Sequence, residues 1–259
     1  FGAMKLESHI VPAVKVKVTM PDISEMSAHV AALKVPWRGK TFVLSGPGRS
    51  LKGEDHFAAS VNYRDRKAGS AVFCIQTEEL PDDELAETIV RETGVPAENL
   101  YLIAARTGCI TGAIQVCARN VEQVLPTLHD RGFPMEYIVE ASGTTPLISI
   151  TDDEKTAWGR VNDCLIYGQE SSIYVRCEDE AVRAMLPDIP FSKNTAIYGV
   201  PFYDLFEQCD WSWAKVPRDW DAPCKVNFIN LMTGSIFTTG VIGYTTLERS
   251  FMGNGEVVT

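Results

Sequence analysis

Hydrophobic and polar positions follow two different spacings along the chain, and they predict both strands and helices. Residues 9–21 read HIVPAVKVKVTMP, where apolar and polar residues alternate as in a half-buried strand that ends at Pro21. Residues 69–77 are a short apolar run that predicts a buried strand, and residues 79–95 combine an acidic first turn with helical apolar spacing. With a further strand in residues 96–107, this order predicts a βαβ-like unit.

The remaining elements follow from the same two patterns. Apolar residues at helical spacing predict helices over residues 23–33, 115–125, 155–168, 178–189 and 202–209. Apolar runs that lead into turns predict strands within residues 40–51, 135–150 and 171–177, and a hairpin over residues 225–241. We therefore predict an α/β fold of two closely packed α/β lobes, residues 4–134 and 135–259, with one compact unit as the alternative.

Two stretches of small residues follow predicted strands, SGPGR at residues 45–49 and ASGTT at residues 141–145. Because ligands in α/β folds bind beside the ends of strands, we predict that these stretches are loops at a ligand cleft between the lobes. The candidate substrate-binding residues in them are Ser45, Gly46, Gly48, Arg49, Ser142, Gly143 and Thr144. SGPGR matches neither a Walker loop nor GxGxxG, so an ordinary tight turn is the competing interpretation.

Two adjacent polar residues inside the predicted helix over residues 155–168 are further candidates for substrate binding. Asn162 and Asp163 interrupt the apolar segment WGRVNDCLIYG. Contact with a ligand and membership of a buried hydrogen-bond network are equally good explanations of this pattern. We therefore keep both residues as candidate substrate-binding residues.

An isolated pair of charges is the strongest candidate for chemistry. Arg119 is the single charged residue in residues 107–120, and Glu122 follows three positions later, before Pro126 interrupts the helical pattern. Residues at i and i+3 of a helix share one side, so the two side chains can touch. On a solvated surface such a pair contributes only ~0.3 kcal/mol. In a partly dry cleft, burial raises and the arginine lowers the pKa of the carboxyl, and the balance decides whether it acts as a base.

Composition narrows the class of protein. The 259 residues include 24 basic and 34 acidic residues, and the net charge of −10 argues against a nucleic-acid-binding protein. No apolar run approaches the ~20 residues that span a bilayer, and the seven cysteines contain no CxxC pair, which is typical of free thiols in a reducing cytosol. We expect a cytoplasmic protein without a membrane segment, in which FGA before Met4 is a remnant of expression.

Neither a metal site nor a common hydrolase motif is evident. The four histidines show no HxH or HxxxH spacing, and no pair of cysteines stands near them, so we expect no catalytic metal. The chain also lacks the GxSxG sequence of a nucleophile elbow. A Ser–His–Asp triad has no fixed spacing in a sequence and stays an open alternative to the pair of Arg119 and Glu122.

Several stretches, taken in order, resemble the methenyltetrahydromethanopterin cyclohydrolase family of archaeal and methylotroph one-carbon metabolism. They are LSGPGRSL (44–51), the long segment 80–122, ASGTTPLISI (141–150), WGRVNDCLIYG (158–168) and GVPFYDLFEQCDWSW (199–213). The resemblance implies a pterin-binding α/β enzyme of two lobes that forms a homo-oligomer and needs no cofactor. It also implies that Arg119 and Glu122 are the family's arginine and water-activating glutamate.

The resemblance implies hydrolysis of the methenyl bridge of 5,10-methenyltetrahydromethanopterin to the N5-formyl form. The sequence departs from the family in two respects: the family has a longer N-terminal region, and it reads Asp-His-Pro where this chain has Thr19, Met20 and Pro21. A diverged paralogue is therefore the alternative. Such a protein would act on a related pterin, or would bind a pterin or a pathway partner without catalysis.

Overall fold

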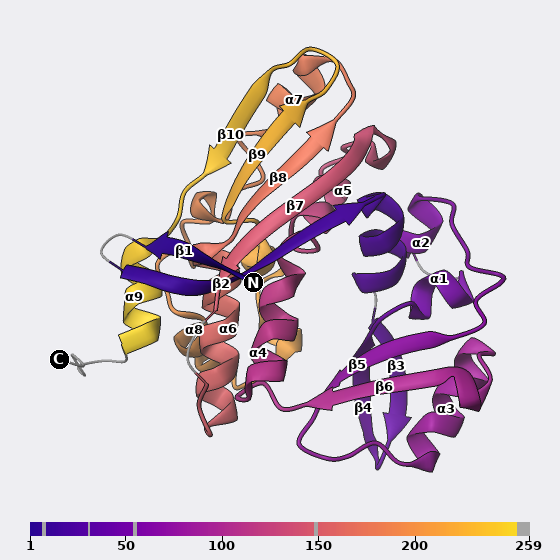
Figure 1. The fold of residues 1–259 in the computed structure, drawn as a ribbon. Coiled ribbons are helices and arrows are strands. Elements are labelled where there is room, and N and C mark those ends of the chain that lie inside the picture. Colours follow the sequence, from indigo (N-terminus) through magenta and orange to yellow (C-terminus); the bar gives the residue numbers. More distant parts are fainter. Residues whose placement is uncertain (7–8, 31, 54–55, 148–149, 253–259) are drawn as a thin grey trace. The chain divides into compact units, whose positions relative to one another are not determined.

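The computed structural model describes residues 1–6, 9–30, 32–53, 56–147 and 150–252 (Figure 1). The chain divides into two compact units. We call residues 1–19 with 107–259 the large unit and residues 20–106 the small unit. The sequence analysis predicts a boundary between two lobes at residue 134. In the structure, residues 1–19 belong to the same unit as residues 107–259. The predicted cleft between lobes stays a prediction.

A six-stranded sheet forms one layer of the large unit, with the strand order β1-β2-β7-β8-β9-β10. Neighbouring strands are antiparallel except β8 and β9, which are parallel. The strands are β1 (Gly2–Leu6), β2 (His9–Thr19), β7 (Ile138–Pro146), β8 (Glu170–Val175), β9 (Lys225–Asn230) and β10 (Ile236–Gly240). Strand β2 is the predicted alternating strand, and β9 with β10 is the predicted hairpin, so both predictions are confirmed.

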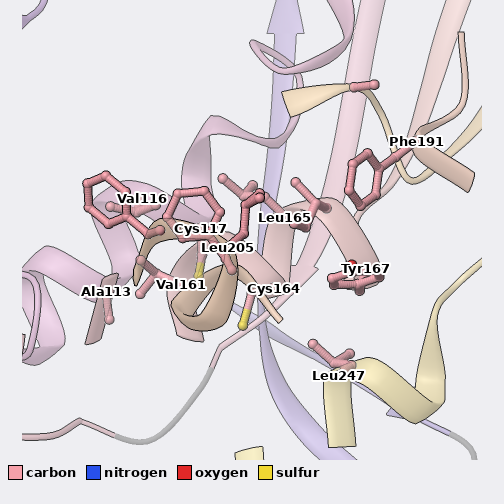
Figure 2. Close-up of a cluster of buried hydrophobic side chains, with 14 of the residues drawn as sticks. Ala113, Val116, Cys117, Val161, Cys164, Leu165, Tyr167, Phe191, Leu205 and Leu247 are labelled. Atoms are coloured by element: carbon pink, nitrogen blue, oxygen red, sulfur yellow. The ribbon is translucent and has the colours of Figure 1, made fainter. Parts of the chain in front are cut away.

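Helices α4 (Ile110–Cys117), α8 (Phe202–Gln208) and α9 (Tyr244–Met252) pack against α6 (Glu154–Gly168), which has ten buried residues among its 15 (Figure 1). Figure 2 shows this core, where Val161 and Leu165 of α6 lie near Val116 of α4 and Leu205 of α8. The other helices are α5 (Val124–Asp130) and α7 (Asp179–Met185). Short 3₁₀ turns are η3 (Ala118–Asn120), η4 (Met135–Tyr137), η5 (Phe191–Lys193), η6 (Trp213–Lys215) and η7 (Arg218–Asp221).

Close packing of α6 against α8 requires a glycine. A Cβ atom on Gly159 would lie 2.8 Å from Cβ of Tyr203, which is too close for two carbon atoms. The absence of a side chain therefore lets the two helices approach closely. Beside this contact, aromatic rings from α8 and the following turns pack together, including Phe202, Phe206, Trp213 and Trp220.

The small unit contains the predicted βαβ arrangement. Its four-stranded sheet has the order β3-β4-β5-β6, and the parallel neighbours β5 and β6 are connected through α3. The strands are β3 (Ala32–Trp37), β4 (Lys40–Ser45), β5 (Ala71–Gln76) and β6 (Leu100–Ala105). The helices are η1 (Asp22–His29), α1 (Gly48–Lys52), α2 (His56–Ser60), α3 (Asp83–Thr93) and η2 (Ala97–Asn99).

Three expectations need correction. The helix predicted over residues 23–33 is a π-helix that ends at His29, because the next residues pair with β4 as the edge strand β3. The helix predicted over residues 115–125 begins at Ile110 and is interrupted after Cys117. Pro126 does not stop the chain from continuing as α5, because it lies in the first turn, where a helix leaves backbone N–H groups unpaired.

The apolar face of α3 stabilises the small unit, and a leucine pair tests this. Leu85 on α3 is completely buried, whereas Leu80 in the preceding loop is 82% exposed. Leu85→Ala should lower the free energy of unfolding by about 2–5 kcal/mol, because it removes buried methyl groups and leaves a cavity. The control Leu80→Ala should change it by less than about 0.5 kcal/mol. Urea unfolding followed by circular dichroism measures both values, and equal effects would contradict this account of the core.

Candidate active site

The candidate catalytic residues lie at an interruption between two helices of the large unit. Helix α4 ends at Cys117, and Arg119 has φ −80° and ψ 19°, outside the helical range. The N–H of Gln123 still donates to the carbonyl of Arg119 at 3.0 Å, so the chain turns without unwinding completely. The break is therefore a local kink that precedes α5.

Arg119 and Glu122 form a forked ion pair across this kink. The Nε atom of Arg119 donates to Oε2 of Glu122 at 2.5 Å, and a terminal guanidinium nitrogen donates to Oε1. The Glu122 side chain is only 11% exposed and that of Arg119 is 34% exposed. Bidentate pairing fixes the plane of the carboxylate and favours its ionised form. The predicted contact between these side chains is present, and the pair does not lie on a fully solvated face.

The ASGTT segment is part of a strand rather than a loop. Ser142, Gly143 and Thr144 lie within β7, which pairs with β2 on one side and with β8 on the other. Hydrogen bonding to two neighbouring strands keeps this segment extended, although glycine is depleted in strands. A Cβ on Gly143 would lie 2.0 Å from Oδ1 of Asn120, so a glycine is needed at this position to make room for that side chain.

The SGPGR segment combines the end of a strand with the start of a short helix in the small unit. Ser45 ends β4, and Gly48 and Arg49 begin α1. Gly46 has φ +144°, a conformation that favours glycine, and a Cβ on it would lie 2.6 Å from the carbonyl of Val72. The guanidinium of Arg49 lies 4.9 Å from the ring centre of Phe57. The turn is thus shaped by packing, and substrate binding by these residues stays a prediction.

Asn162 and Asp163 both lie on the buried helix α6. Nδ2 of Asn162 donates to the carbonyl of Trp158 at 2.8 Å, and the N–H of Phe202 donates to Oδ1 of Asp163 at 2.8 Å. Burial raises the pKa of Asp163 to about 7, although hydrogen bonds from Ser250 and from the N–H of Phe202 lower it. Each side chain thus takes part in a hydrogen bond within the large unit, and contact with a ligand stays a prediction for both residues.

A carboxyl that the sequence did not suggest lies electrostatically close to Glu122. Burial raises the pKa of Asp221 to about 6, Arg218 opposes this, and the charge of Glu122 raises it further. Gln123, next to Glu122, donates from Nε2 to the carbonyl of Ala222 at 3.1 Å, which connects the two segments. No motif in the segment RDWD marks this proximity, because it arises from folding alone.

Asp221 also lines a polar pocket of about 370 Å³ in the large unit. The ends of α5, η5 and η7 form its wall, and the charged lining residues are Asp130, Arg131, Asp188, Lys193, Arg218, Asp219 and Asp221. Several of these charges already form ion pairs, such as Arg218 with Asp221 at 3.1 Å.

Among the described residues, no helix is both long and apolar enough to cross a membrane.

Comparison with known proteins adds to this geometry. A family profile described as "Cyclohydrolase (MCH)" matches residues 2–251. Methenyltetrahydromethanopterin cyclohydrolase of Methanothermobacter thermautotrophicus is 31% identical over 253 residues, which cover 95% of this chain and 77% of that protein. The protein of the same name from Methanocaldococcus jannaschii is 31% identical over 245 residues, covering 92% and 74%. That from Methylobacillus flagellatus is 31% identical over 207 residues, covering 80% and 63%.

The buried carboxyl of Asp163 makes stability depend on pH in a defined direction. Its pKa is about 7 in the folded protein, and about 4 in an unfolded chain. Between these values the folded state holds the extra proton, so the stability of the wild type should fall as pH rises. Relative to Asp163→Asn, the expected slope is about 1.4 kcal/mol per pH unit from pH ~4 to ~7, and zero above. Urea unfolding of both proteins at several pH values measures it, and a constant difference would contradict the expectation.

Proposed function

The chain belongs to the methenyltetrahydromethanopterin cyclohydrolase family, and on that premise we propose that it hydrolyses the methenyl bridge of 5,10-methenyltetrahydromethanopterin to the N5-formyl form. The observation that carries the proposal is the forked ion pair of Arg119 and Glu122 in a mostly buried position. The relatives described above carry one name, so a diverged paralogue with another substrate is not favoured.

Glu122 supplies the base that this hydrolysis needs. The bridge between N5 and N10 is an amidinium-like cation, and water attacks its bridging carbon while Glu122 accepts one proton of that water. The bond from this carbon to N10 then breaks as Glu122 returns the proton to N10. The remaining hydroxyl proton passes to solvent, leaving a neutral formyl group on N5. One cation and one water thus give one neutral product and one proton.

Arg119 has a supporting role in this scheme. Its guanidinium holds both carboxylate oxygens of Glu122, which orients the base and keeps it ionised before the attack. The carboxylate also stabilises the cationic substrate by its charge. Since these groups supply the base, the acid and the electrostatic stabilisation, the proposed reaction uses neither a metal nor a redox cofactor.

The proposal extends to the surroundings of the site. We propose that nine further residues contribute to the substrate-binding region, by contact or by supporting its walls. They are Ser45, Gly46, Gly48, Arg49, Ser142, Gly143, Thr144, Asn162 and Asp163. The packing of Gly143 against Asn120 and the burial of Asp163 favour a supporting role for these two residues. We further propose a cytoplasmic protein that forms a homo-oligomer and does not bind nucleic acid.

Replacing the base should abolish most of the turnover. Glu122→Gln keeps the shape of the side chain but removes the proton acceptor, so kcat should fall by about 10²–10⁴ with little change in substrate binding. The measurement is the loss of methenyl absorbance when purified protein is mixed with methenyltetrahydromethanopterin. Glu180→Gln, an exposed carboxyl on α7, is the matched control and should retain activity. Wild-type protein that binds the pterin without hydrolysing it would contradict the proposed function.

Removing the guanidinium group of Arg119 should change the pH dependence of the reaction. Without its guanidinium, Arg119→Ala leaves Glu122 in a mostly buried site with less stabilisation of the ionised form, so the pKa of the carboxyl rises. The acidic limb of the kcat–pH profile should therefore move to higher pH, and activity should recover in part on the alkaline side. A uniform loss at every pH would mean that Arg119 acts by another route.

A further inference from the structure

The kink at Arg119 leaves a backbone carbonyl that the helix does not satisfy. In a continuous helix, the N–H of Val124 would donate to the carbonyl of Asn120. Here that N–H donates instead to the carbonyl of Val121, at 3.0 Å. Asn120 is fully buried, so water cannot replace the lost bond.

A serine from the sheet supplies the missing donor. Oγ of Ser171, on β8, donates to the carbonyl of Asn120 at 3.0 Å. Nε2 of Gln169 donates to Oγ of Ser171, and Oε1 of Gln169 accepts from the N–H of Cys224 at 2.9 Å. Every group in this chain of bonds donates in the same direction, toward Asn120. The backbone N–H of Cys224 can only donate, which assigns the oxygen and nitrogen of the Gln169 amide.

The side chain of Asn120 fills the space on the other side of the kink. Its Nδ2 donates to the carbonyl of Cys117 at 3.2 Å, which holds the last turn of α4. Its Oδ1 lies so close to Gly143 that a Cβ atom on that residue would be only 2.0 Å away. Among the residues that the structure describes, no donor reaches this oxygen. The side chain is thus wedged between the kink and β7.

We propose that Asn120 and Ser171 are positioning residues that hold Arg119 and Glu122 in register for their forked ion pair. This inference rests on the proposed function, because it assigns a role in the reaction of Glu122. Asn120 lies between the two charged residues, so a rotation of its backbone would move one relative to the other. The bonds from Ser171 and Gln169 prevent that rotation by tying the kink to β8 and to Cys224, the residue before β9.

The test compares two serines that are adjacent on one strand. Ser171 is completely buried and bonded to Asn120, whereas its neighbour Ser172 is half-buried on the opposite face of β8. Ser171→Ala should lower kcat about 10-fold while KM changes less than about 2-fold, since the carboxylate loses its orientation but substrate contacts remain. Ser172→Ala should leave both unchanged. Ser171→Cys keeps a weak donor and should give an intermediate kcat.

A second readout separates positioning from folding and does not need turnover. The pKa of Glu122 can be followed by ¹³C NMR of protein labelled at the glutamate carboxyl carbon, with the signal identified by its loss in Glu122→Gln. This pKa should rise in Ser171→Ala, because a loosened ion pair stabilises the carboxylate less, and should stay unchanged in Ser172→Ala. Thermal melting reports the stability of each variant.

The outcomes decide the proposal in either direction. A raised pKa in Ser171→Ala, with the graded effect of Ser171→Cys, supports it even if the wild type shows no turnover, in which case the proposed function alone fails. Ser171→Ala with a lower melting temperature but the same pKa and kcat as Ser172→Ala would overturn it. In that case the buried bonds would serve stability alone.

Discussion

The interruption between α4 and α5 is the constraint on which the candidate site depends. Buried carbonyls are normally hydrogen-bonded, and among the described residues a side chain from the sheet, Ser171, meets this need at Asn120. Ser171 thus ties the kink to β8, and β8 pairs in turn with β7 and β9. The hydrogen bonds of Asn120 to Ser171 and to Cys117 therefore connect the strand and the helix directly beside the charged pair.

Small residues in this protein mark close packing as much as they mark loops. Gly143 gives space to Asn120, and Gly159 lets α8 approach α6. A stretch of small residues after an apolar run therefore has two meanings, a turn near a ligand or a strand against which another segment packs. SGPGR is a turn that leads into a short helix, whereas ASGTT is a strand against which another segment packs. Sequence alone does not distinguish them, since the deciding neighbours come from distant parts of the chain.

Local patterns predicted what depends on local physics. The strand over residues 9–21, the βαβ unit and the terminal hairpin all followed from spacing and turn signals, and so did the contact of Arg119 with Glu122. Strand β1 was missed because its first residues were taken for a remnant of expression, and α9 was missed although Tyr244, Leu247 and Phe251 stand at helical spacing. The large unit combines residues 1–19 with 107–259 because β2 pairs with β7, more than 120 positions later in the chain. The proximity of Asp221 to Glu122 is non-local in the same way.

The surroundings of three carboxyls explain why Glu122 is the best candidate for the base. Asp163 is buried and, among the described residues, has no cation as a partner, so burial brings its pKa to about 7, while its Oδ1 accepts from the N–H of Phe202. Asp221 shares Arg218 with Asp130, and burial still raises its pKa to about 6. Glu122 alone among these combines low exposure with a two-point contact to a guanidinium. A base must be ionised before it reacts, and of the three environments this one best stabilises the ionised form.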